Sequence, residues 1–553
     1  MARLTQVGTL LCALSSVAVA GAPSAQKWTE RSIYQIMTDR FARPKGAADD
    51  TCDSYKYCGG SWAGIIDKLD YIQDLGFTAL QISPVVENIP DNTEYGEAYH
   101  GYWPRNLYAL NSHFGTADDL QKLSKELHKR GMYLMVDVVI NDMAQAINGS
   151  MTDDPSPKID YSRLVPFNDE KYYHPFCSIT DWNDPDIIKQ CWLGEEVVAL
   201  PDLKTDHSDV VSTIQTWVKG LVGNYSIDGL RIDATKHMDD AYLTNFTQAA
   251  GVFTMGEVYS GDPNTVCRYK QFVSDLLNYP VYYPMIDAFT AGNMPGLAEN
   301  VRKAPDDCGA LATFVENHDL PRFASLDNDT TLAKNAMAFN ILSDGIPIVY
   351  QGQEQHMKGD YAPYNRDPLW TTGYSTDGSL YKLTSTLNKL RNHAIRNDKN
   401  YISNTSQELY VDGSTYATRK GSEGTQIVSV FSNQGARGGP YQLKVAGAYS
   451  PGTEVMEMLN CTKLNATDAG DINVDMNAGE PRVFFPVKKL DGSGLCGFAK
   501  RKASGCTPSG NTTSTQKNNT KEEDVPESTG HHVSVSFSTF VLGVVVGAAG
   551  WLL

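Results

Sequence analysis

The chain has 553 residues, of which 41% are hydrophobic, and it contains eight Trp and 29 Tyr. This length allows two or three domains, and the composition is that of a globular protein with a large core. The formal net charge of −18 argues against nucleic acid or an anionic membrane surface as a partner, because both are polyanions. We therefore expect a neutral substrate, or an acidity that serves solubility.

The N-terminus has the features of a secretory signal peptide, which we place at residues 1–20. A single Arg3 precedes an apolar stretch, and Ala18 and Ala20 supply the small residues of a cleavage site. The sequence thus predicts entry into the secretory pathway.

Short apolar runs bounded by turn residues recur eight times between residues 27 and 400. They read SIYQIM, FTALQISP, YLMVDVVIN, DGLRIDA, VFTMGEV, PVYYPMI, ATFVENHD and GIPIVYQGQE. Several are separated by helix-like stretches, such as the one from Thr116 to Gly131 with its acidic first turn. Strands that alternate with helices imply a parallel sheet, and eight such units predict a closed (β/α)₈ TIM barrel.

Two further regions interrupt or follow this alternation of strands and helices. Residues 141–203, after the third run, form a long excursion rich in Pro, Asp and Tyr, and its length predicts a small inserted domain B. Residues 401–496 change to short β-like runs with Gly turns, which predicts a separate C-terminal antiparallel β domain.

The C-terminal segments indicate a tether. Residues 497–528 are rich in Ser, Thr, Asn and Lys and cannot bury a core, so we expect a stalk. Residues 529–553 follow small residues with a polar spacer and an apolar tail, the order of a GPI-attachment signal. A tail anchor that spans the bilayer is the alternative, although no cytoplasmic Lys/Arg cluster follows. We expect the chain at the cell surface, GPI-anchored in the plasma membrane or wall.

The cysteines fit an oxidising compartment. Ten are present, and Cys12 leaves with the signal peptide. Short separations suggest four pairs, although spacing alone does not fix connectivity, and Cys506 would be left over. The pairs are Cys52 with Cys58, Cys177 with Cys191, Cys267 with Cys308, and Cys461 with Cys496.

The run DGLRIDA carries charges that an apolar core strand would not. In a barrel, Asp233 would lie at the carboxyl end of the fourth strand, the face where barrel enzymes place their chemistry. Glu257 ends the fifth run in the same way, and His318 and Asp319 end the seventh. Three converging carboxylates repel one another and raise at least one pKa, which suits acid/base or acid/nucleophile catalysis.

Each carboxylate alone could instead cap a helix or pair with a surface Lys. A carboxylate trio also suits a divalent metal, so a barrel metal hydrolase is an alternative. These positions lack the His ligands that usually accompany catalytic zinc.

Four segments in chain order resemble sequence signatures of the α-amylase family of glycoside hydrolases, glycoside hydrolase family 13. They are MVDVVIND, GLRIDATKH, GEVY and FVENHD, and LPDLKT resembles a fifth. The similarity runs from about residue 28 to about residue 487 and is closest to secreted fungal α-amylases. It implies retaining double displacement on α-glucosidic bonds. Asp233 would be the nucleophile, Glu257 the acid and then the base, and Asp319 a ligand of sugar hydroxyls.

The resemblance also implies a substrate-binding set: His100, Tyr102, Trp103, Arg231, Lys236, His237, His318 and Arg366. Tyr102 would stack on the apolar C–H face of a sugar, and His318 would hydrogen-bond the sugar at the cleaved bond. Packing within loops is the alternative role for His100 and Tyr102. Arg231 is expected to lower the pKa of Asp233 and so keep the nucleophile ionised.

A calcium ion is implied where the excursion meets the barrel. Its ligands would be the side chains of Asn141 and Asp202 and the backbone carbonyl of His237, since calcium prefers oxygen donors. Hydrogen bonds that only fix loops are the alternative for Asn141 and Asp202.

Two departures from the family pattern bear on the reaction. The first signature ends Asn141-Asp142 where relatives end Asn-His, and Ala362 stands where the fungal pattern Asp-Pro-x-Asn-Arg has its carboxylate. Both changes fall on the donor side, so an acceptor sugar could outcompete water for the intermediate.

Together with the surface anchor, these departures favour a 4-α-glucanotransferase of cell-wall α-glucan, belonging to a GPI-anchored subgroup of the family. An α-amylase that hydrolyses α-1,4 bonds of starch-like glucans is the alternative. A catalytically silent glucan-binding surface protein is the third reading. We expect a monomer.

Overall fold

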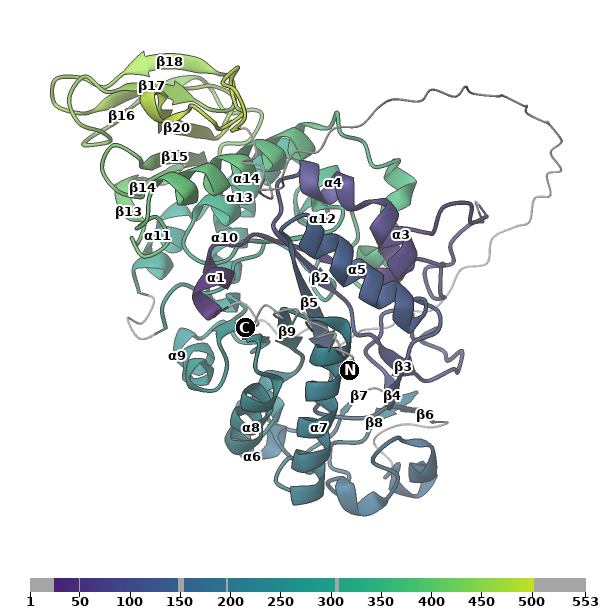
Figure 1. The fold of residues 1–553 in the computed structure, drawn as a ribbon. Coiled ribbons are helices and arrows are strands. Elements are labelled where there is room, and N and C mark those ends of the chain that lie inside the picture. The colour runs from purple at the N-terminus through teal and green to yellow at the C-terminus, as the bar shows by residue number, and fades with distance from the viewer. Residues whose placement is uncertain (1–23, 49, 148–153, 195–196, 304–307, 502–553) are drawn as a thin grey trace, which may run out of the picture.

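The computed structural model describes residues 24–48, 50–147, 154–194, 197–303 and 308–501. The predicted signal peptide, nearly all of the stalk, the GPI signal and Cys506 lie outside these residues. Figure 1 shows a barrel surrounded by helices and, at one end, a separate β domain built from the C-terminal part of the chain. In the described part of the chain, no helix combines the length and apolarity that crossing a membrane requires.

The barrel sheet is parallel and closed. Its strands follow the order β11-β10-β9-β5-β2-β1-β12. Single bridges from Leu277 to Ala312 and from Thr313 to Pro347 place residues 312–313 between β11 and β12. They are the seventh strand position in chain order and bring the total to eight. The predicted (β/α)₈ barrel is therefore confirmed. The strand bounds are β1 Ile33–Ile36, β2 Ala79–Ile82, β5 Tyr133–Val138, β9 Gly229–Ile232, β10 Phe253–Gly256, β11 Asp275–Leu276 and β12 Ile348–Tyr350.

One of the eight predicted strands is wrong. The run PVYYPMI lies inside helix α10 (Tyr279–Thr290), and the sixth strand is the short β11 just before it. Asn278 starts the helix because its side chain accepts a hydrogen bond from the Val281 amide, and Pro280 occupies the first turn, where no amide hydrogen is needed. The buried Tyr282, Met285 and Phe289 recur at helical spacing.

Helices form the outer layer. Helix α5 shows why these residues form a helix. Thr116 and Asp119 form a capping box at its start, and Leu120, Leu123 and Leu127 form its buried face. The predicted helix after Thr116 is thus confirmed. The longer helices are α3 Trp62–Asp67, α4 Leu69–Asp74, α5 Ala117–Lys129, α7 Ser208–Tyr225, α8 Asp240–Ala250, α11 Met294–Arg302, α13 Thr330–Leu342 and α14 Ser379–Asn397. Shorter ones are α1 Ala25–Thr29, α2 Thr38–Phe41, α6 Pro185–Ile188, α9 Pro263–Cys267 and α12 Phe323–Leu326.

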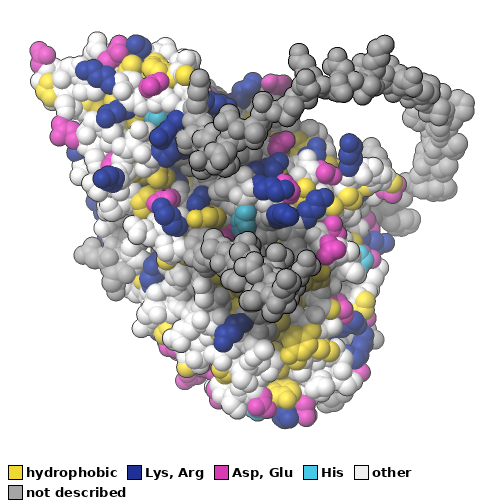
Figure 2. Space-filling model, in the orientation of Figure 1, with side chains coloured by type: hydrophobic (Ala, Val, Ile, Leu, Met, Phe, Trp, Pro, Cys, Tyr) yellow, Lys and Arg dark blue, Asp and Glu magenta, His cyan; other side chains and the backbone are white. Residues whose placement is uncertain are grey.

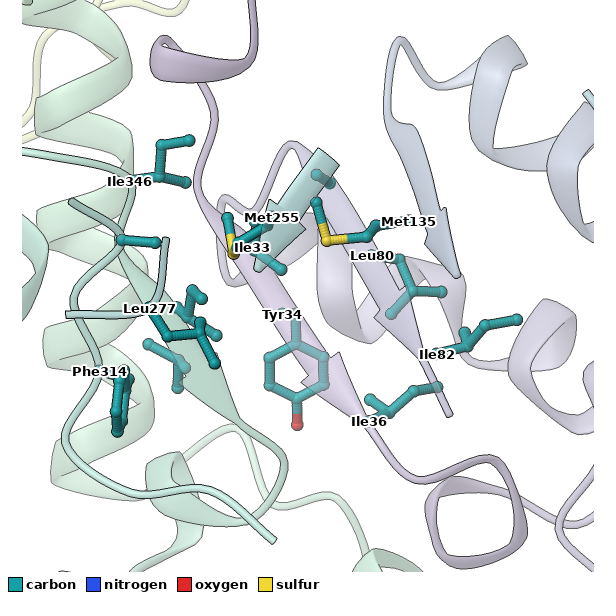
Figure 3. Close-up of a cluster of buried hydrophobic side chains, with 14 of the residues drawn as sticks. Ile33, Tyr34, Ile36, Leu80, Ile82, Met135, Met255, Leu277, Phe314 and Ile346 are labelled. Carbon is teal, nitrogen blue, oxygen red and sulfur yellow. The ribbon is translucent and has the colours of Figure 1, made fainter. Parts of the chain in front are cut away.

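The barrel interior and the helix–sheet layer are filled by apolar side chains. Figure 3 shows Ile33, Leu80, Met135 and Met255, which come from β1, β2, β5 and β10, and all four are fully buried. Burial of this kind is the main stabilising term of the fold. It gives the strand ends a rigid base on which polar side chains can be positioned.

The insertion and the C-terminal domain are smaller β structures. The insertion contains a sheet ordered β6-β8-β7 (Gln145–Ala146, Val198–Leu200, Leu193–Gly194), and a hairpin of β3 (Val86–Asn88) and β4 (Pro104–Leu110) precedes it in the chain. The C-terminal domain has a six-stranded antiparallel sheet and a two-stranded one, as predicted. Their strands are β13 Gln407–Val411, β14 Thr415–Lys420, β15 Ile427–Ser432, β16 Tyr441–Val445, β17 Glu454–Glu457, β18 Thr462–Asn465, β19 Ile472–Met476 and β20 Arg482–Pro486.

All four predicted disulfides are present: Cys52–Cys58, Cys177–Cys191, Cys267–Cys308 and Cys461–Cys496. On the face seen in Figure 2, acidic and basic side chains are interspersed over the barrel and the C-terminal domain.

Candidate active site

The predicted carboxylates meet at one end of the barrel. Asp233 directly follows β9 and Glu257 directly follows β10, and both backbone amides still bond to the neighbouring strand, at 3.1 and 2.9 Å. His318 and Asp319 follow the strand position at residues 312–313. Because the strands are parallel, their carboxyl ends lie at the same end of the barrel.

Arg231 organises this end of the barrel. Its guanidinium is 1% exposed and lies 3.0 Å from Asp137, 2.6 Å from Asp233 and 2.8 Å from Glu257. In the sheet, Arg231 is the direct neighbour of Asp137 on β5. One buried cation therefore holds three carboxylates together, which explains why a core strand contains an arginine.

The pKa of Asp233 does not follow the expectation from sequence. Burial raises this pKa well above its ordinary value, Arg231 acts in the opposite direction, and the Glu257 carboxylate raises it again. Arg231 lowers the pKa of Asp233, as predicted, but burial outweighs this effect and the neighbouring carboxylates add to the rise, so the net pKa is raised and not lowered. The Asp233 side chain keeps 21% of its surface exposed, so a substrate can reach it.

Asp319 has the opposite electrostatic environment. Its carboxylate lies 3.0 Å from His318 Nε2 and 3.1 Å from Arg366 Nη2. Burial would raise the pKa of Asp319, but His318 and Arg366 together lower it well below its ordinary value. Asp319 is thus an ionised acceptor, suited to bind sugar hydroxyls.

Tyr102 and His318 form the aromatic wall of the site. Their rings stack with centroids 5.0 Å apart and planes at 13°. The Tyr102 hydroxyl donates to Asp137 at 2.7 Å, and Gln35 Nε2 lies 3.3 Å from His318 Nδ1. Both rings are therefore fixed before a substrate binds.

Asp137 is a site residue that the sequence analysis missed. It joins Arg231 to Tyr102, and it is 1% exposed. A carboxylate inside the apolar run YLMVDVV was the signal that could have identified it, because such a charge is retained in a core only with a partner.

His100 and Trp103 lie behind Tyr102. His100 Nδ1 accepts a hydrogen bond from the Tyr102 backbone amide at 3.0 Å, and the His100 ring meets the Trp103 ring edge-on with centroids 4.5 Å apart. Burial lowers the pKa of His100 well below its ordinary value, so this imidazole is neutral. The predicted group His100, Tyr102 and Trp103 is brought together beside His318.

Lys236 and His237 follow β9 in a short 3-10 turn. Lys236 donates to the Tyr259 carbonyl at 3.4 Å, and its ammonium lies 5.6 Å from the ring centre of Trp182. The His237 ring is buried, with Nδ1 2.8 Å from the Ile188 carbonyl of the insertion. Lys236 therefore lies on the Glu257 side of the site, whereas the His237 ring contacts the insertion rather than the carboxylates.

The side-chain oxygens of Asn141 and Asp202, which were predicted to bind calcium, lie together where the insertion joins the barrel. Asn141 Nδ2 donates to Asp202 Oδ1 at 3.0 Å, and Asp142 pairs directly with Asp202 across an antiparallel bridge. Oδ1 of Asn141 and Oδ1 of Asp142 are buried and lack a hydrogen-bond partner within the described residues. Burial raises the pKa of Asp142, and its neighbour Asp202 raises it further.

This donor set fits a hard cation. Buried oxygens without donors are costly on their own, and calcium prefers carboxylate, amide and carbonyl oxygens. The set consists of the Asn141 amide and the carboxylates of Asp142 and Asp202. The described residues contain no cluster of three or more His, Cys, Asp or Glu arranged for a metal. His174 also contacts Asp202, at 2.7 Å.

Arg366 reaches the site from the loop that follows β12. Its Nε donates to the His318 carbonyl at 2.9 Å, in addition to its contact with Asp319. The preceding Asn365 is fully buried and donates to the carbonyls of His318 and Leu320, each at 3.0 Å. The structure thus joins Arg366, which the resemblance placed in the substrate-binding set, to His318 and Asp319.

A parallel barrel that brings two carboxylates together on one guanidinium, beside stacked aromatic rings, is typical of a glycosidase. Comparison with known proteins agrees. Residues 35–412 match the family described as Alpha amylase, catalytic domain, and residues 408–504 match Alpha-amylase, domain C. The chain belongs to the α-amylase family and is a glycosidase of that family.

Its relatives include fungal enzymes of similar length. Alpha-amylase 1 of Schwanniomyces occidentalis is 48% identical over 480 residues, which cover 86% of this chain and 92% of the relative. The alpha-amylase of Saccharomycopsis fibuligera is 45% identical over 472 residues, covering 84% and 93%.

Solved structures show the same fold. An alpha-amylase from Malbranchea cinnamomea superposes with a TM-score of 0.81 at 48% identity, covering 86% of this chain and all of that one. A gamma-CGTase from an alkalophilic Bacillus clarkii has a TM-score of 0.70 at 24% identity, covering 83% and 70%. That second likeness concerns the fold alone.

Proposed function

We propose that this chain is an α-amylase that hydrolyses α-1,4-glucosidic bonds of starch-like glucans with retention of configuration. The observation that carries the proposal is the pairing of Asp233 and Glu257 on one guanidinium. Such pairing keeps the two carboxylates close, as retaining glycosidases require, whereas inverting enzymes leave room for a water between them. The sequence analysis favoured glucan transfer, but the fungal relatives at 45–48% identity are named alpha-amylases, and this supports hydrolysis.

The proposed reaction has two steps. An oxygen of ionised Asp233 attacks the anomeric carbon while Glu257 gives its proton to the glycosidic oxygen, so the C–O bond breaks and the leaving sugar departs as an alcohol. Glu257, now a carboxylate, then takes a proton from water, and that water displaces Asp233 from the anomeric carbon. Both carboxyl groups return to their starting states.

The remaining residues bind and orient. Asp319 would accept hydrogen bonds from sugar hydroxyls, with His318 and Arg366 keeping it ionised. Tyr102 would stack against the sugar face, since its ring is already fixed by Asp137 and His318. Arg231 would hold Asp233 and Glu257 in place, and Lys236 lies on the side where the leaving sugar departs.

The raised pKa of Asp233 predicts the acid side of the pH profile. A carboxyl group is a nucleophile only when ionised, so kcat/KM should fall as pH decreases through this pKa, above the ordinary Asp value of about 4. Asp319, with a lowered pKa, stays ionised over that range. The measurement is kcat/KM for maltoheptaose between pH 3 and 8. A profile that stays flat down to pH 3 would contradict the assignment of Asp233.

Calcium would be held by the side chains of Asn141 and Asp202 and by the His237 carbonyl, and we add Asp142 because its unpartnered oxygen lies in the same place. The ion would tie the insertion to the barrel. We expect a chelator to lower the melting temperature by several degrees and added calcium to restore it, as binding to the folded state requires. Differential scanning fluorimetry provides the measurement.

A matched pair of variants checks the calcium assignment. Asp202→Asn should lose the response to calcium, whereas Asp275→Asn should keep it, because Asp275 is a buried carboxylate paired with Lys270. An unchanged melting temperature after chelation of the native chain would remove calcium from the account.

Product analysis separates hydrolysis from the alternatives. The full chain is incubated with maltoheptaose, and the products are resolved by chromatography. We expect only shorter oligosaccharides. Longer products would establish the 4-α-glucanotransferase that Asp142 and Ala362 suggested, and an unchanged substrate would indicate a glucan-binding protein.

Surface attachment remains part of the proposal. The disulfides support folding in an oxidising compartment, and the C-terminal order of small residues, spacer and apolar tail supports a GPI anchor. Phosphatidylinositol-specific lipase should release the protein from membranes; retention after this treatment would favour the tail anchor.

A further inference from the structure

Two tyrosines are exposed on the loop that carries Arg366. In the described part of the chain five large hydrophobic side chains are exposed, and Tyr361, at 50%, and Tyr364, at 44%, are two of them. Their ring centroids are 5.4 Å apart with planes at 86°. Tyr55 meets Tyr364 edge-on at 6.5 Å. Such a concentration of exposed aromatic surface is typical of a binding site.

The backbone beneath these rings is held firmly. Asn365 is fully buried, and its carbonyl accepts a hydrogen bond from Arg322 Nε at 2.9 Å. Its amide nitrogen bonds to the Tyr361 carbonyl at 3.0 Å. Gly359 packs so closely on the loop that an added Cβ would lie 2.2 Å from the Tyr364 carbonyl oxygen. The rings are therefore presented by a preorganised loop, which lowers the entropic cost of binding.

The loop also fixes where the tyrosines lie relative to the reaction. Arg366 contacts Asp319 at 3.1 Å, and Tyr364 precedes it by two residues, so their Cα atoms are at most about 7 Å apart. The tyrosines thus lie on the Asp319 side. Lys236 and the exposed Trp182 lie on the Glu257 side, where the protonated leaving group departs.

We propose that Tyr361 and Tyr364 form an outer subsite for the part of an α-1,4-glucan that stays attached to Asp233, beyond the sugar units near Arg366. This inference rests on the proposed function and extends it to the preference for longer glucan substrates. Aromatic faces stack on the apolar C–H face of a glucosyl unit, and the phenol hydroxyl adds a hydrogen bond. Ala362, which lies between the two tyrosines in the sequence, offers no carboxylate for sugar hydroxyls, so stacking on the rings would provide the contact instead.

The test compares a short and a long substrate. The double variant Tyr361→Ala/Tyr364→Ala should lower kcat/KM for maltoheptaose about tenfold, the equivalent of roughly 1.4 kcal/mol. Maltotriose places at most two glucosyl units on the Asp233 side of the cleaved bond and so leaves an outer subsite empty. Its kcat/KM should change less than about twofold by the same arithmetic. Tyr108→Ala is the matched control, because Tyr108 is 63% exposed on β4 and outside this loop; it should behave as the native chain on both substrates.

A binding measurement on a chain that cannot cleave its substrate tests the subsite independently of the proposed function. Maltoheptaose is titrated calorimetrically into the Glu257→Gln chain with and without the two tyrosines, and a loss of affinity of about tenfold is expected. If the native chain cleaves nothing but this loss is seen, the proposed function fails and the subsite stands. The subsite would be overturned if the double variant had unchanged affinity for maltoheptaose and its kcat/KM changed equally for both substrates or for neither.

Discussion

The Asp233→Asn variant should cleave maltoheptaose at least about 10⁴-fold more slowly than the native chain, as removal of a catalytic nucleophile does in well-studied hydrolases. The amide has nearly the same shape as the carboxylate but cannot attack the anomeric carbon or form the covalent intermediate. Removing one carboxylate from the shared guanidinium should also relieve repulsion, so the fold is expected to persist. The measurement is initial rate together with melting temperature.

Asp228→Asn is the matched control for this variant. Asp228 precedes β9 at its other end, where it contacts His128 at 2.7 Å and the Leu134 amide at 2.8 Å. Its loss should lower stability and leave kcat/KM within severalfold of the native value. An Asp233→Asn chain that kept more than a few per cent of native activity would remove Asp233 as the nucleophile.

Arg231→Met should destabilise the protein by about 3–5 kcal/mol. The substitution leaves Asp137, Asp233 and Glu257 close together without a cation, and like charges in a buried site cannot all stay ionised. Activity should fall as well, because Asp233 and Glu257 lose their common anchor. The measurement is the midpoint of thermal or denaturant unfolding at neutral pH.

The control for Arg231 is an arginine of the surface. Arg130 pairs with Asp70, whose side chain is 83% exposed, and such pairs contribute about 0–1 kcal/mol. Arg130→Met should therefore shift the midpoint only slightly. Equal losses in the two variants would show that Arg231 has no special role in holding the carboxylates.

The sequence predicts most of the barrel because its strands are continuous apolar runs with turn residues at their ends. The sixth strand could not be predicted, since β11 has only two residues and pairing with neighbours, rather than composition, defines it. The aromatic run after it resembled a strand, but the Asn278 cap and the helical spacing of its buried residues make it α10.

The site residues were predictable where a charged residue stands at the end of an apolar run. They were less predictable where the contact partner lies in a distant part of the sequence. Asp233 and Glu257 follow strands directly, and Asp319 lies at the end of the apolar run that contains residues 312–313. The position of Asp137 depends on the register of β5 against β9, and the pairing of Asp142 with Asp202 depends on the return of the insertion to the barrel. The net pKa of Asp233 likewise depends on how deeply the carboxyl group is buried and on the carboxylates around Arg231, which no local pattern specifies.

The most direct test of the central claim is proton NMR of the first products from maltoheptaose. Retaining hydrolysis through Asp233 predicts that the new reducing ends appear as α anomers and convert to the β form only later, by mutarotation. New reducing ends that appear first as β anomers, or a substrate that remains uncleaved, would contradict the account.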